Sequence, residues 1–302
     1  MENGRATAPH LPVLLNETVS ALDPQGGDDV LDGTLGAGGH AAAILERTAP
    51  DGRYLGLDLD ATALETARRN LDRFGSRVML VRGSYREAAS IAASRGWGSF
   101  QAALLDLGFS SMEIDDPTRG FSFRTDGPLD MRYDDRQELT AAVIVNGWSR
   151  DEIERVIRLY GEERFARRIA ERLVEERRRQ RFTGTLELAE AIARAVPAGY
   201  RHGPIHCATR TFQALRIAVN DELGALTEAL PVLLDLLAPG GRLAVISFHS
   251  LEDRIVKRFM RRASDEGRLK LLNKKPVTAS AEELRENPRA RSAKLRAAMK
   301  SE

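Results

Sequence analysis

The sequence predicts an α/β protein with an open, mostly parallel sheet and an inserted helical subdomain. From residue 28 to 108, short apolar runs alternate with segments of helical spacing, which is typical of parallel strands joined by right-handed crossovers. A long interval separates Asp106 from the next convincing strand at Gly241, whereas a usual crossover needs about a dozen residues. A glycine-rich turn follows the first strand, where sheets of this kind bind nucleotides.

Short apolar runs carry the strand prediction. They are Asp28–Gly33, Arg53–Asp58, Arg77–Gly83, Gln101–Gly108 and Gly241–Phe248. Segments with helical spacing and good helix formers predict helices at His40–Arg47, Ala61–Phe74, Tyr85–Arg95 and Leu251–Arg262. Two segments near the C-terminus, Leu269–Leu272 and Ala293–Ala298, are candidates for a final strand.

The residues from 112 to 210 are predicted to form the helical insertion. Ser149, with Glu152 three residues later, has the spacing of a capping box at a helix start. The helical segments that follow are Asp151–Tyr160, Glu162–Arg179 and Leu186–Val196. We therefore expect a discontinuous sheet domain, 1–111 with 211–302, interrupted by a helical subdomain.

The composition is that of an ordinary globular protein, with 42% hydrophobic and 29% charged residues. No apolar run approaches the ~18 residues of a membrane span, and residues 1–12 lack the features of a secretory signal. The single cysteine, Cys207, excludes an intrachain disulfide and a cysteine-based zinc cluster. We therefore expect a cytoplasmic protein without a membrane segment.

Charge is distributed unevenly along the chain. The formal net charge is +1, but residues 251–302 carry 15 Lys and Arg against 8 Asp and Glu. A basic end of this kind suits an anionic partner such as RNA, and it suits a solvated terminal helix equally well.

The glycine-rich turn reads DGTLGAGGH from Asp32 to His40. Residues 36–41 fit the G-x-G-x-x-[GA] pattern of dinucleotide sites, although a plain tight turn gives the same letters. Asp58 ends the second predicted strand, where a carboxylate can accept both hydroxyls of a ribose. The alternative for Asp58 is to cap the next helix, a role that Asp60 serves equally well. The glycine-rich turn and Asp58 together predict a site for an adenosine-type nucleotide.

Two ligands fit this pattern, NAD and S-adenosylmethionine. NAD carries an anionic pyrophosphate, whereas S-adenosylmethionine carries a cationic sulfonium. Asp32 and Asp106 end the first and fourth predicted strands, so acidic side chains surround the crevice in which the ligand lies. This arrangement favours S-adenosylmethionine. Tyr85, just after the third strand, is placed either to stack on the adenine or to pack in the core.

Longer blocks of the sequence resemble the bacterial RsmH (MraW) family of methyltransferases. The blocks are His10–Glu17, Asp32–His40, Leu105–Asp135, Tyr160–Ile169, Ala208–Leu223, Ile246–Phe259 and Glu283–Arg296. They span nearly the whole chain, and their length and order make the resemblance specific. It implies a class I (Rossmann-like) S-adenosylmethionine methyltransferase sheet. It also implies an enzyme that methylates N4 of a cytidine in 16S ribosomal RNA of the small ribosomal subunit, with the insertion recognising the substrate.

The resemblance also implies a set of cofactor contacts. They are Gly38, Gly39, His40, Asp58, Tyr85, Asp106 and Glu113. The block around Glu113 reads FSSMEI where family members typically read VSSPQL, so an acid replaces an amide and a proline is lost. We therefore expect Glu113 to accept a hydrogen bond or to face the sulfonium.

Methyl transfer from a sulfonium needs neither a metal nor a covalent enzyme intermediate, and positioning of the reactants can supply much of the rate. The acceptor amine of cytosine is a poor nucleophile because its lone pair is delocalised into the ring. Asp106 is the candidate for binding its N–H groups and accepting the surplus proton, with Ser110 and Ser111 as orienting neighbours. For the two serines, a purely turn-forming role is equally open.

Several residues of the insertion region are candidates for binding the unstacked base or its ribose. They are Phe121, Phe123, Asp130, Arg132 and Asn220. Aromatic stacking would support a flipped base, although a hydrophobic plug beneath the loop fits the two phenylalanines equally well. Candidates for phosphate contacts are Arg177–Arg181, Lys257, Arg258, Arg261, Arg262, Lys274, Lys275, Arg289, Arg291, Lys294 and Arg296.

Other functions stay open from the sequence. The turn and Asp58 alone fit a nicotinamide-dependent oxidoreductase, and the altered FSSMEI block fits a ribosome-assembly factor that kept the fold but lost the chemistry. Amino-group DNA methylation is disfavoured, because DLGFS stands at Asp106 where a DPPY-like sequence is expected. No metal site is expected, since His10 and His206 lack ligand spacing, and the oligomeric state is open.

Overall fold

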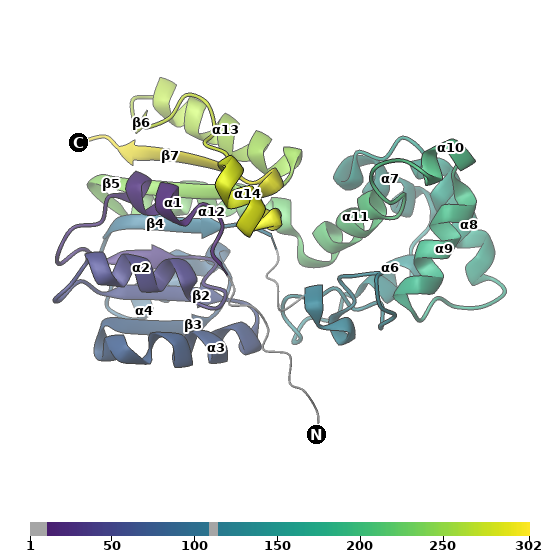
Figure 1. Ribbon diagram of the computed structural model, residues 1–302, viewed down its shortest axis with the longest axis horizontal. Helices are drawn as coiled ribbons and strands as arrows, with labels where there is room; N and C mark the ends of the chain where they lie inside the picture. The colour runs from purple at the N-terminus through teal and green to yellow at the C-terminus, as the bar shows by residue number, and fades with distance from the viewer. Residues whose placement is uncertain (1–10, 109–113) are drawn as a thin grey trace. The chain divides into compact units, whose positions relative to one another are not determined.

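The structure, a computed structural model, describes residues 11–108 and 114–302 (Figure 1). The chain divides into two compact units. The sheet unit comprises 1–108 with 224–302, and the helical unit comprises 109–223. No helix of the described ranges is both long enough and apolar enough to cross a membrane.

A seven-stranded sheet in the order β3-β2-β1-β4-β5-β7-β6 forms the centre of the sheet unit. Its strands are β1 (Val30–Asp32), β2 (Tyr54–Asp58), β3 (Val78–Arg82), β4 (Phe100–Asp106), β5 (Leu237–Ser247), β6 (Leu269–Leu271) and β7 (Lys294–Lys300). β1 to β5 pair in parallel, whereas β7 is antiparallel to β5 and β6. The predicted fold class is therefore confirmed, and both candidate C-terminal segments form strands.

Helices cover both faces of this sheet (Figure 1). They are α1 (Leu15–Leu22), α2 (Gly39–Arg47), α3 (Ala61–Leu71), α4 (Ala88–Ser94), α12 (Glu222–Leu236), α13 (Ser250–Asp265) and α14 (Ala281–Glu286), with 3₁₀ turns η1 (Asp72–Arg77), η2 (Tyr85–Glu87) and η4 (Pro288–Ser292). Leu31 and Leu105 pack with α4, α12 and α13, whereas Val30 and Leu104 pack with α1, α2 and α3. Because successive strand residues enter opposite cores, the strands read as continuous apolar runs in the sequence.

The order of the strands positions the site. β1 lies between β2 and β4, so the connections turn to opposite sides at β1, and ligands of such sheets bind outside the carboxyl ends of the strands at this point. Asp32, Asp58 and Asp106 are the last residues of β1, β2 and β4. We call the edge at which these parallel strands end the carboxyl edge.

The helical unit is built of short amphipathic helices around a core of its own. They are η3 (Pro117–Arg119), α6 (Ala141–Gly147), α7 (Arg150–Gly161), α8 (Ala166–Arg177), α9 (Thr185–Ala195), α10 (Ala198–Arg201) and α11 (Thr209–Asn220). The capping box at Ser149 and Glu152 is confirmed, with each side chain bonded to the other's backbone N–H.

α11 belongs to the helical unit because it packs tightly on α7. A Cβ atom at Gly161 would come within 2.5 Å of the carbonyl oxygen of Arg210, so only glycine allows this approach. The helical unit accordingly extends through Leu223. The sequence had placed the residues from 211 onward in the sheet domain.

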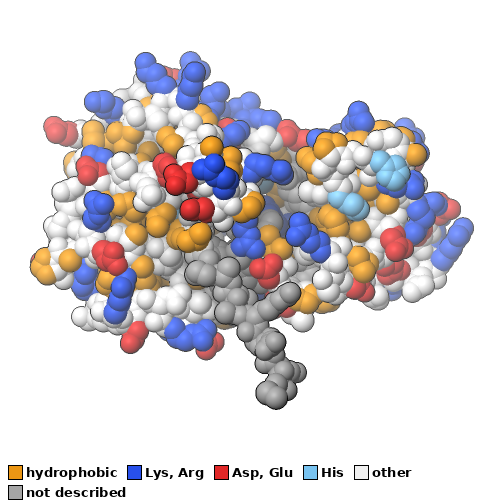
Figure 2. Space-filling model, viewed as in Figure 1, with side chains coloured by type: hydrophobic (Ala, Val, Ile, Leu, Met, Phe, Trp, Pro, Cys, Tyr) orange, Lys and Arg blue, Asp and Glu red, His pale blue; other side chains and the backbone are white. Residues whose placement is uncertain are grey.

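Basic side chains are concentrated on one part of the sheet unit. Figure 2 shows Lys and Arg side chains along the upper rim of the view, over α13 and β6. These elements form the end of the sheet opposite β3.

Candidate active site

The glycine-rich turn links β1 to the start of α2. Gly36 and Gly38 have positive φ angles of 53° and 83°, which side-chain-bearing residues rarely adopt. A Cβ atom at Gly39 would lie 2.4 Å from Cγ of Pro12, so the segment before α1 closes over the turn only because this residue has no side chain. The glycines thus set both the shape of the turn and its contact with the N-terminal segment.

Three carboxyl groups meet this turn at the carboxyl edge. Asp32 is 1% exposed, and its Oδ1 atom accepts the Thr34 N–H at 2.9 Å. Asp58 accepts the Gly36 N–H at 2.8 Å, which ties the end of β2 to the turn. Oδ1 of Asp106 is buried and has no hydrogen-bond partner among the residues that the structure describes. Asp106 therefore offers a buried acceptor that a ligand can satisfy.

Asp32 is buried and Asp58 and Asp106 are half-buried, which makes their ionised forms costly. Removal from water raises the pKa of Asp32 and of Asp58 to about 6, and the neighbouring carboxylates add to the rise. The pKa of Asp106 lies well above its ordinary value, because of burial and of the negative charges of Asp32 and Glu252. A cationic ligand would relieve this repulsion, whereas an anionic pyrophosphate would increase it. The acids therefore fit the sulfonium and ammonium groups of S-adenosylmethionine.

His40 connects the N-terminal segment to Asp106. It lies in the first turn of α2 and is 6% exposed. Nε2 is 3.0 Å from the carbonyl oxygen of Val13, and Nδ1 is 3.6 Å from Oδ2 of Asp106. Because a carbonyl oxygen only accepts, Nε2 carries the proton in this contact, and Nδ1 faces the carboxyl group.

Tyr85 lies beside the turn at the start of η2. It is half-buried and packs against the apolar core that β1 and β4 share with α4. A Cβ atom at Gly33 would lie 2.7 Å from Cβ of Tyr85, so the absence of a side chain at Gly33 lets the tyrosine approach β1. Tyr85 thus stands next to the residues expected to hold the nucleotide.

Two residues that sequence reasoning missed support the carboxylates. The hydroxyl of Tyr54 donates to Oδ2 of Asp32 at 2.8 Å, and the hydroxyl of Thr34 accepts the backbone N–H of Asp106 at 2.6 Å. Thr34 could have been found as the residue two positions after Asp32 in the turn. Tyr54 lies 22 residues away, and no local pattern marks it.

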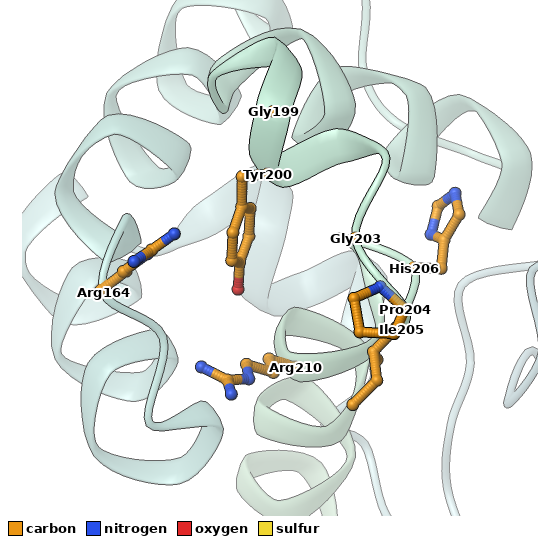
Figure 3. A pocket seen from close by; sticks show the side chains of 8 residues that line it. All are labelled: Arg164, Gly199, Tyr200, Gly203, Pro204, Ile205, His206 and Arg210. Carbon is orange, nitrogen blue, oxygen red and sulfur yellow. The ribbon is translucent and has the colours of Figure 1, made fainter.

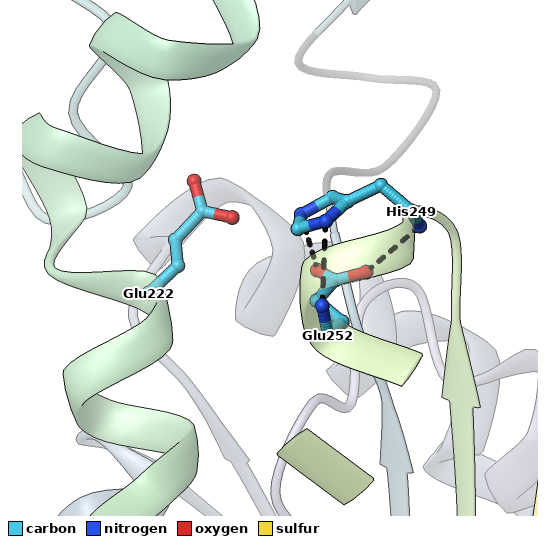
Figure 4. Close-up of side chains that lie close together, drawn as sticks. All are labelled: Glu222, His249 and Glu252. Carbon is cyan, nitrogen blue, oxygen red and sulfur yellow. Dashed lines mark hydrogen bonds and ion pairs between the residues drawn. The ribbon is translucent and has the colours of Figure 1, made fainter. Parts of the chain in front are cut away.

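His249 and Glu252 form the cap of α13 (Figure 4). Oε2 of Glu252 accepts the Phe248 and His249 backbone N–H groups at 2.9 and 3.2 Å, and Nδ1 of His249 accepts the Glu252 N–H at 3.4 Å. The pair fixes the turn that follows β5 at the carboxyl edge. Through this cap, the charge of Glu252 is held where it acts on Asp106.

The aromatic candidates for base stacking both pack inside the helical unit. Phe121 stacks on Tyr133 with ring centroids 5.5 Å apart. Phe123 contacts His206 and Phe212 at centroid distances of 4.7 and 4.8 Å. These contacts correspond to the hydrophobic-plug alternative for the loop.

The polar candidates of the helical unit are engaged with one another and with the backbone. Asp130 and Arg132 form an ion pair of 2.7 Å. The side chain of Asn220 accepts the Tyr133 N–H at 2.7 Å and donates to the Met131 carbonyl at 2.7 Å. Asn220 thus fixes the end of the loop on α11. Ser110, Ser111 and Glu113 lie outside the described residues.

The helical unit also contains a cavity of about 320 Å³ that the sequence did not indicate (Figure 3). Its lining residues are Arg164, Gly199, Tyr200, Gly203, Pro204, Ile205, His206 and Arg210. Arg164 lies over the Tyr200 ring at 4.8 Å, and the Tyr200 hydroxyl donates to the buried carboxylate of Glu163 at 2.5 Å. The cavity therefore combines an oriented aromatic ring with two arginines.

Comparisons with known proteins show the family of the chain. Residues 7–301 match the model of the MraW methylase family. The chain is 50% identical over 307 residues to the ribosomal RNA small subunit methyltransferase H of Heliobacterium mobile, covering 96% of this chain and 98% of that protein. It is also 50% identical over 306 residues to the protein of the same name from Symbiobacterium thermophilum, covering 96% of each.

Among solved structures, an rRNA methylase from Streptococcus thermophilus aligns with 95% of this chain and 94% of its own, at 12% identity and a TM-score of 0.44. The match to the family model covers nearly the whole chain, and the two relatives match it at nearly full length. On these sequence comparisons, the chain belongs to the MraW methylase family.

Proposed function

We propose that the protein transfers a methyl group from S-adenosylmethionine to N4 of a cytidine in 16S ribosomal RNA of the small ribosomal subunit. The observation that carries the proposal is the group of three carboxyls at the carboxyl edge, of which Asp32 is buried and Asp58 and Asp106 are half-buried, in a chain of the MraW methylase family. The coarser part, a methyltransferase with an RNA substrate, agrees with the names of its relatives.

The chain's own residues would hold the donor at the turn. When bound, S-adenosylmethionine supplies an electrophilic methyl group on a sulfonium. We assign the ribose hydroxyls to Asp58, whose carboxylate already ends β2 beside the turn. We assign the cationic part to Asp32 and the adenine to the side of Tyr85, with Gly38, Gly39 and His40 forming the wall of the turn. Glu113 is assigned to the same ligand from its place in the sequence.

Asp106 is the proposed catalytic residue. Its Oδ1 atom is buried without a partner in the described part of the chain, so it can accept an N–H of the target amine. A hydrogen bond at that position localises the nitrogen lone pair on the nucleophile. The raised pKa of Asp106 then allows the same carboxylate to take the proton that the amine loses. Ser110 and Ser111 follow in the chain and are assigned as orienting residues.

The helical unit is the proposed substrate-recognition subdomain. Phe121, Phe123 and Asn220 shape and fix its loop, and the Asp130–Arg132 pair borders the same segment. The arginines and the tyrosine of the Figure 3 cavity have the chemistry that contacts an RNA phosphate and base. Recognition of the base and binding of the donor would thus be divided between the two units.

Mass spectrometry of ribosomal RNA tests the function directly. Small subunits that lack the modification are incubated with the protein and isotope-labelled S-adenosylmethionine, and the RNA is digested to nucleosides. We expect label in N4-methylcytidine, and none with Asp106→Asn, which keeps the size of the side chain but cannot take a proton. Donor binding with no labelled nucleoside would instead identify a non-catalytic ribosome-binding protein.

A further inference from the structure

α13 carries a basic face on which three side chains have no partner in the described part of the chain. From Arg254 to Arg262, the helix contains five Lys or Arg and no Asp or Glu. Lys257, Arg258 and Arg261 are exposed, and among the described residues none of these three has an ion-pair or hydrogen-bond partner. The positive charges of these three side chains are therefore available to another molecule.

A second arginine-rich helix of the same chain shows the opposite pattern. Along α8 and in the turn that follows it, acids one helical turn away pair with three of the arginines. These pairs are Arg167 with Glu171, Arg172 with Glu176, and Arg179 with Glu175. Like charges one turn apart, such as Lys257 and Arg261, destabilise a helix, whereas opposite charges at that spacing stabilise it. α13 thus retains a repulsion that an anionic partner would relieve.

The basic face begins close to the candidate active site. α13 starts at Ser250, directly after β5 reaches the carboxyl edge, and its first turn holds Glu252 near Asp106. With a rise of about 1.5 Å per residue, Lys257 lies about 10 Å and Arg261 about 16 Å along the axis from the helix start. The face therefore leads away from the site along the sheet unit.

Other exposed lysines lie at the same end of the sheet as α13. α13 packs on β6, the last strand of the sheet. Lys274 and Lys275 lie in the segment that follows β6. Lys270 lies on β6 itself, but Leu269 and Leu271 on either side of it pack in the core beneath α13, so its side chain leaves the opposite face of the sheet. All three are exposed and have no ion-pair partner in the described ranges. The upper rim of Figure 2 shows Lys and Arg side chains gathered over these elements.

The rest of α13 indicates which polyanion fits. Its opposite face buries Val256, Met260 and Ala263 in the core of the sheet unit. Helices that lie on membranes insert an apolar face into the lipid, and α13 has none to offer. Lys294 and Arg296, two other candidates for phosphate contacts, are excluded because both pair with Asp253.

We propose that Lys257, Arg258 and Arg261, with Lys274 and Lys275 at the same end of the sheet, form a track for the phosphates of the RNA substrate, leading from the carboxyl edge. The inference rests on the proposed function, and it assigns backbone binding to the sheet unit. Such contacts position the RNA and carry no sequence information. The track holds the strand beside the site while other residues select the base.

The test compares two triple variants of the full chain. The first, Lys257→Gln with Arg258→Gln and Arg261→Gln, removes three charges from the track. The control, Arg68→Gln with Arg69→Gln and Arg73→Gln, removes three charges at the opposite end of the sheet, in and just after α3. All six side chains are largely solvent-exposed, so both variants should fold. Binding of a fluorescein-labelled single-stranded RNA of mixed sequence is measured from about 50 to 200 mM salt.

We expect the track variant to reduce the slope of log K against log salt by about 2, because each phosphate contact on a single strand contributes about 0.7. The Michaelis constant for small subunits should rise. The turnover number and the affinity for the donor should stay unchanged. An unchanged slope, an equal loss in the control, or binding to phosphatidylserine vesicles instead of RNA would overturn the track. Wild-type protein that binds RNA through the track but transfers no methyl group would contradict the proposed function and leave the track standing.

Discussion

The phenol of Tyr54 donates a hydrogen bond of 2.8 Å to the carboxylate of Asp32. Tyr54 pairs with Val30 across β1 and β2, so it lies on the same sheet face as Asp32, two residues further along β1. The ring is fully buried in an apolar core, where a tyrosine hydroxyl needs a partner. Because Thr34 holds the other oxygen, Asp32 is oriented from both sides before a ligand binds.

Removal of this hydroxyl should weaken donor binding without disturbing the fold. Tyr54→Phe keeps the packed ring, but it removes a hydrogen bond that lowers the pKa of Asp32. We expect the dissociation constant of S-adenosylmethionine to rise about tenfold near neutral pH, since hydrogen bonds to charged groups contribute about 1.5–3 kcal/mol. The loss should shrink as the pH rises. Calorimetric titration across pH measures both effects.

Thr48→Val is the matched control for Tyr54→Phe. It also removes a fully buried hydroxyl from the sheet unit, but Thr48 follows α2 at the far end from the turn and contacts Arg77 and the Leu45 carbonyl. It should lower stability and leave donor affinity and its pH profile unchanged. If donor affinity depends on pH in the same way in both variants, the Tyr54 hydroxyl contributes only to stability and not to donor binding.

Donor binding and stability should depend on pH in opposite directions. The pKa values of Asp32 and Asp58 rise from 3.8 to about 6 on folding, so between these values the folded state holds more protons than the unfolded state. The unfolding free energy of the ligand-free protein should therefore fall as pH increases from about 4 to 6. A cationic donor needs ionised carboxylates, so its affinity should rise across the upper part of this range and level off above about pH 7.

Denaturant unfolding and calorimetry over the same pH series check these slopes. Asp58→Asn should reduce the pH dependence of both the unfolding free energy and the donor affinity. It removes one of the titrating groups while keeping a hydrogen-bond acceptor near the Gly36 N–H. Donor affinity that stays constant across the whole series would contradict an ionised acidic site.

The turn should tolerate no side chain at Gly39. A Cβ atom there would meet Pro12 at 2.4 Å, so Gly39→Ala must displace the segment that leads into α1. We expect destabilisation of about 1–3 kcal/mol, as for other overpacked sites, together with weaker donor binding. Gly98→Ala is the control, since a Cβ atom at Gly98 meets nothing within 4 Å. Equal unfolding free energies for the two variants would refute the close approach.

The strands could be predicted from the sequence because their burial is continuous. Leu31 enters one core while its neighbour Val30 enters the other, so each strand is a short apolar run between polar turns. The positions of Asp32 and Asp58 at strand ends follow from the same runs. The local sequence therefore predicts both the strands of the sheet and the acidic residues at their carboxyl ends.

The remaining features depend on contacts between distant residues. Asp253 neutralises Arg296 from 43 residues away, which no charge count along the chain could show. Asn220, a candidate for substrate binding, also donates to the Met131 carbonyl across 89 residues. The end of the helical unit was misplaced for the same reason, because the contact between Gly161 and Arg210 joins helices far apart in the chain.

A buried ion pair in the helical unit gives a final prediction. Nε and Nη2 of Arg216 each donate to Glu222 at 2.8 Å, and the two side chains are only 8% exposed. Glu222→Ala should destabilise the protein by about 3–5 kcal/mol, because it removes the carboxylate that accepts two hydrogen bonds from a buried guanidinium. Replacing both residues with methionine should cost much less, since no charge then stays buried. Unfolding free energies of Arg216→Met, Glu222→Met and the double variant form the cycle, and additive losses would mean that the pair acts as two independent packing residues.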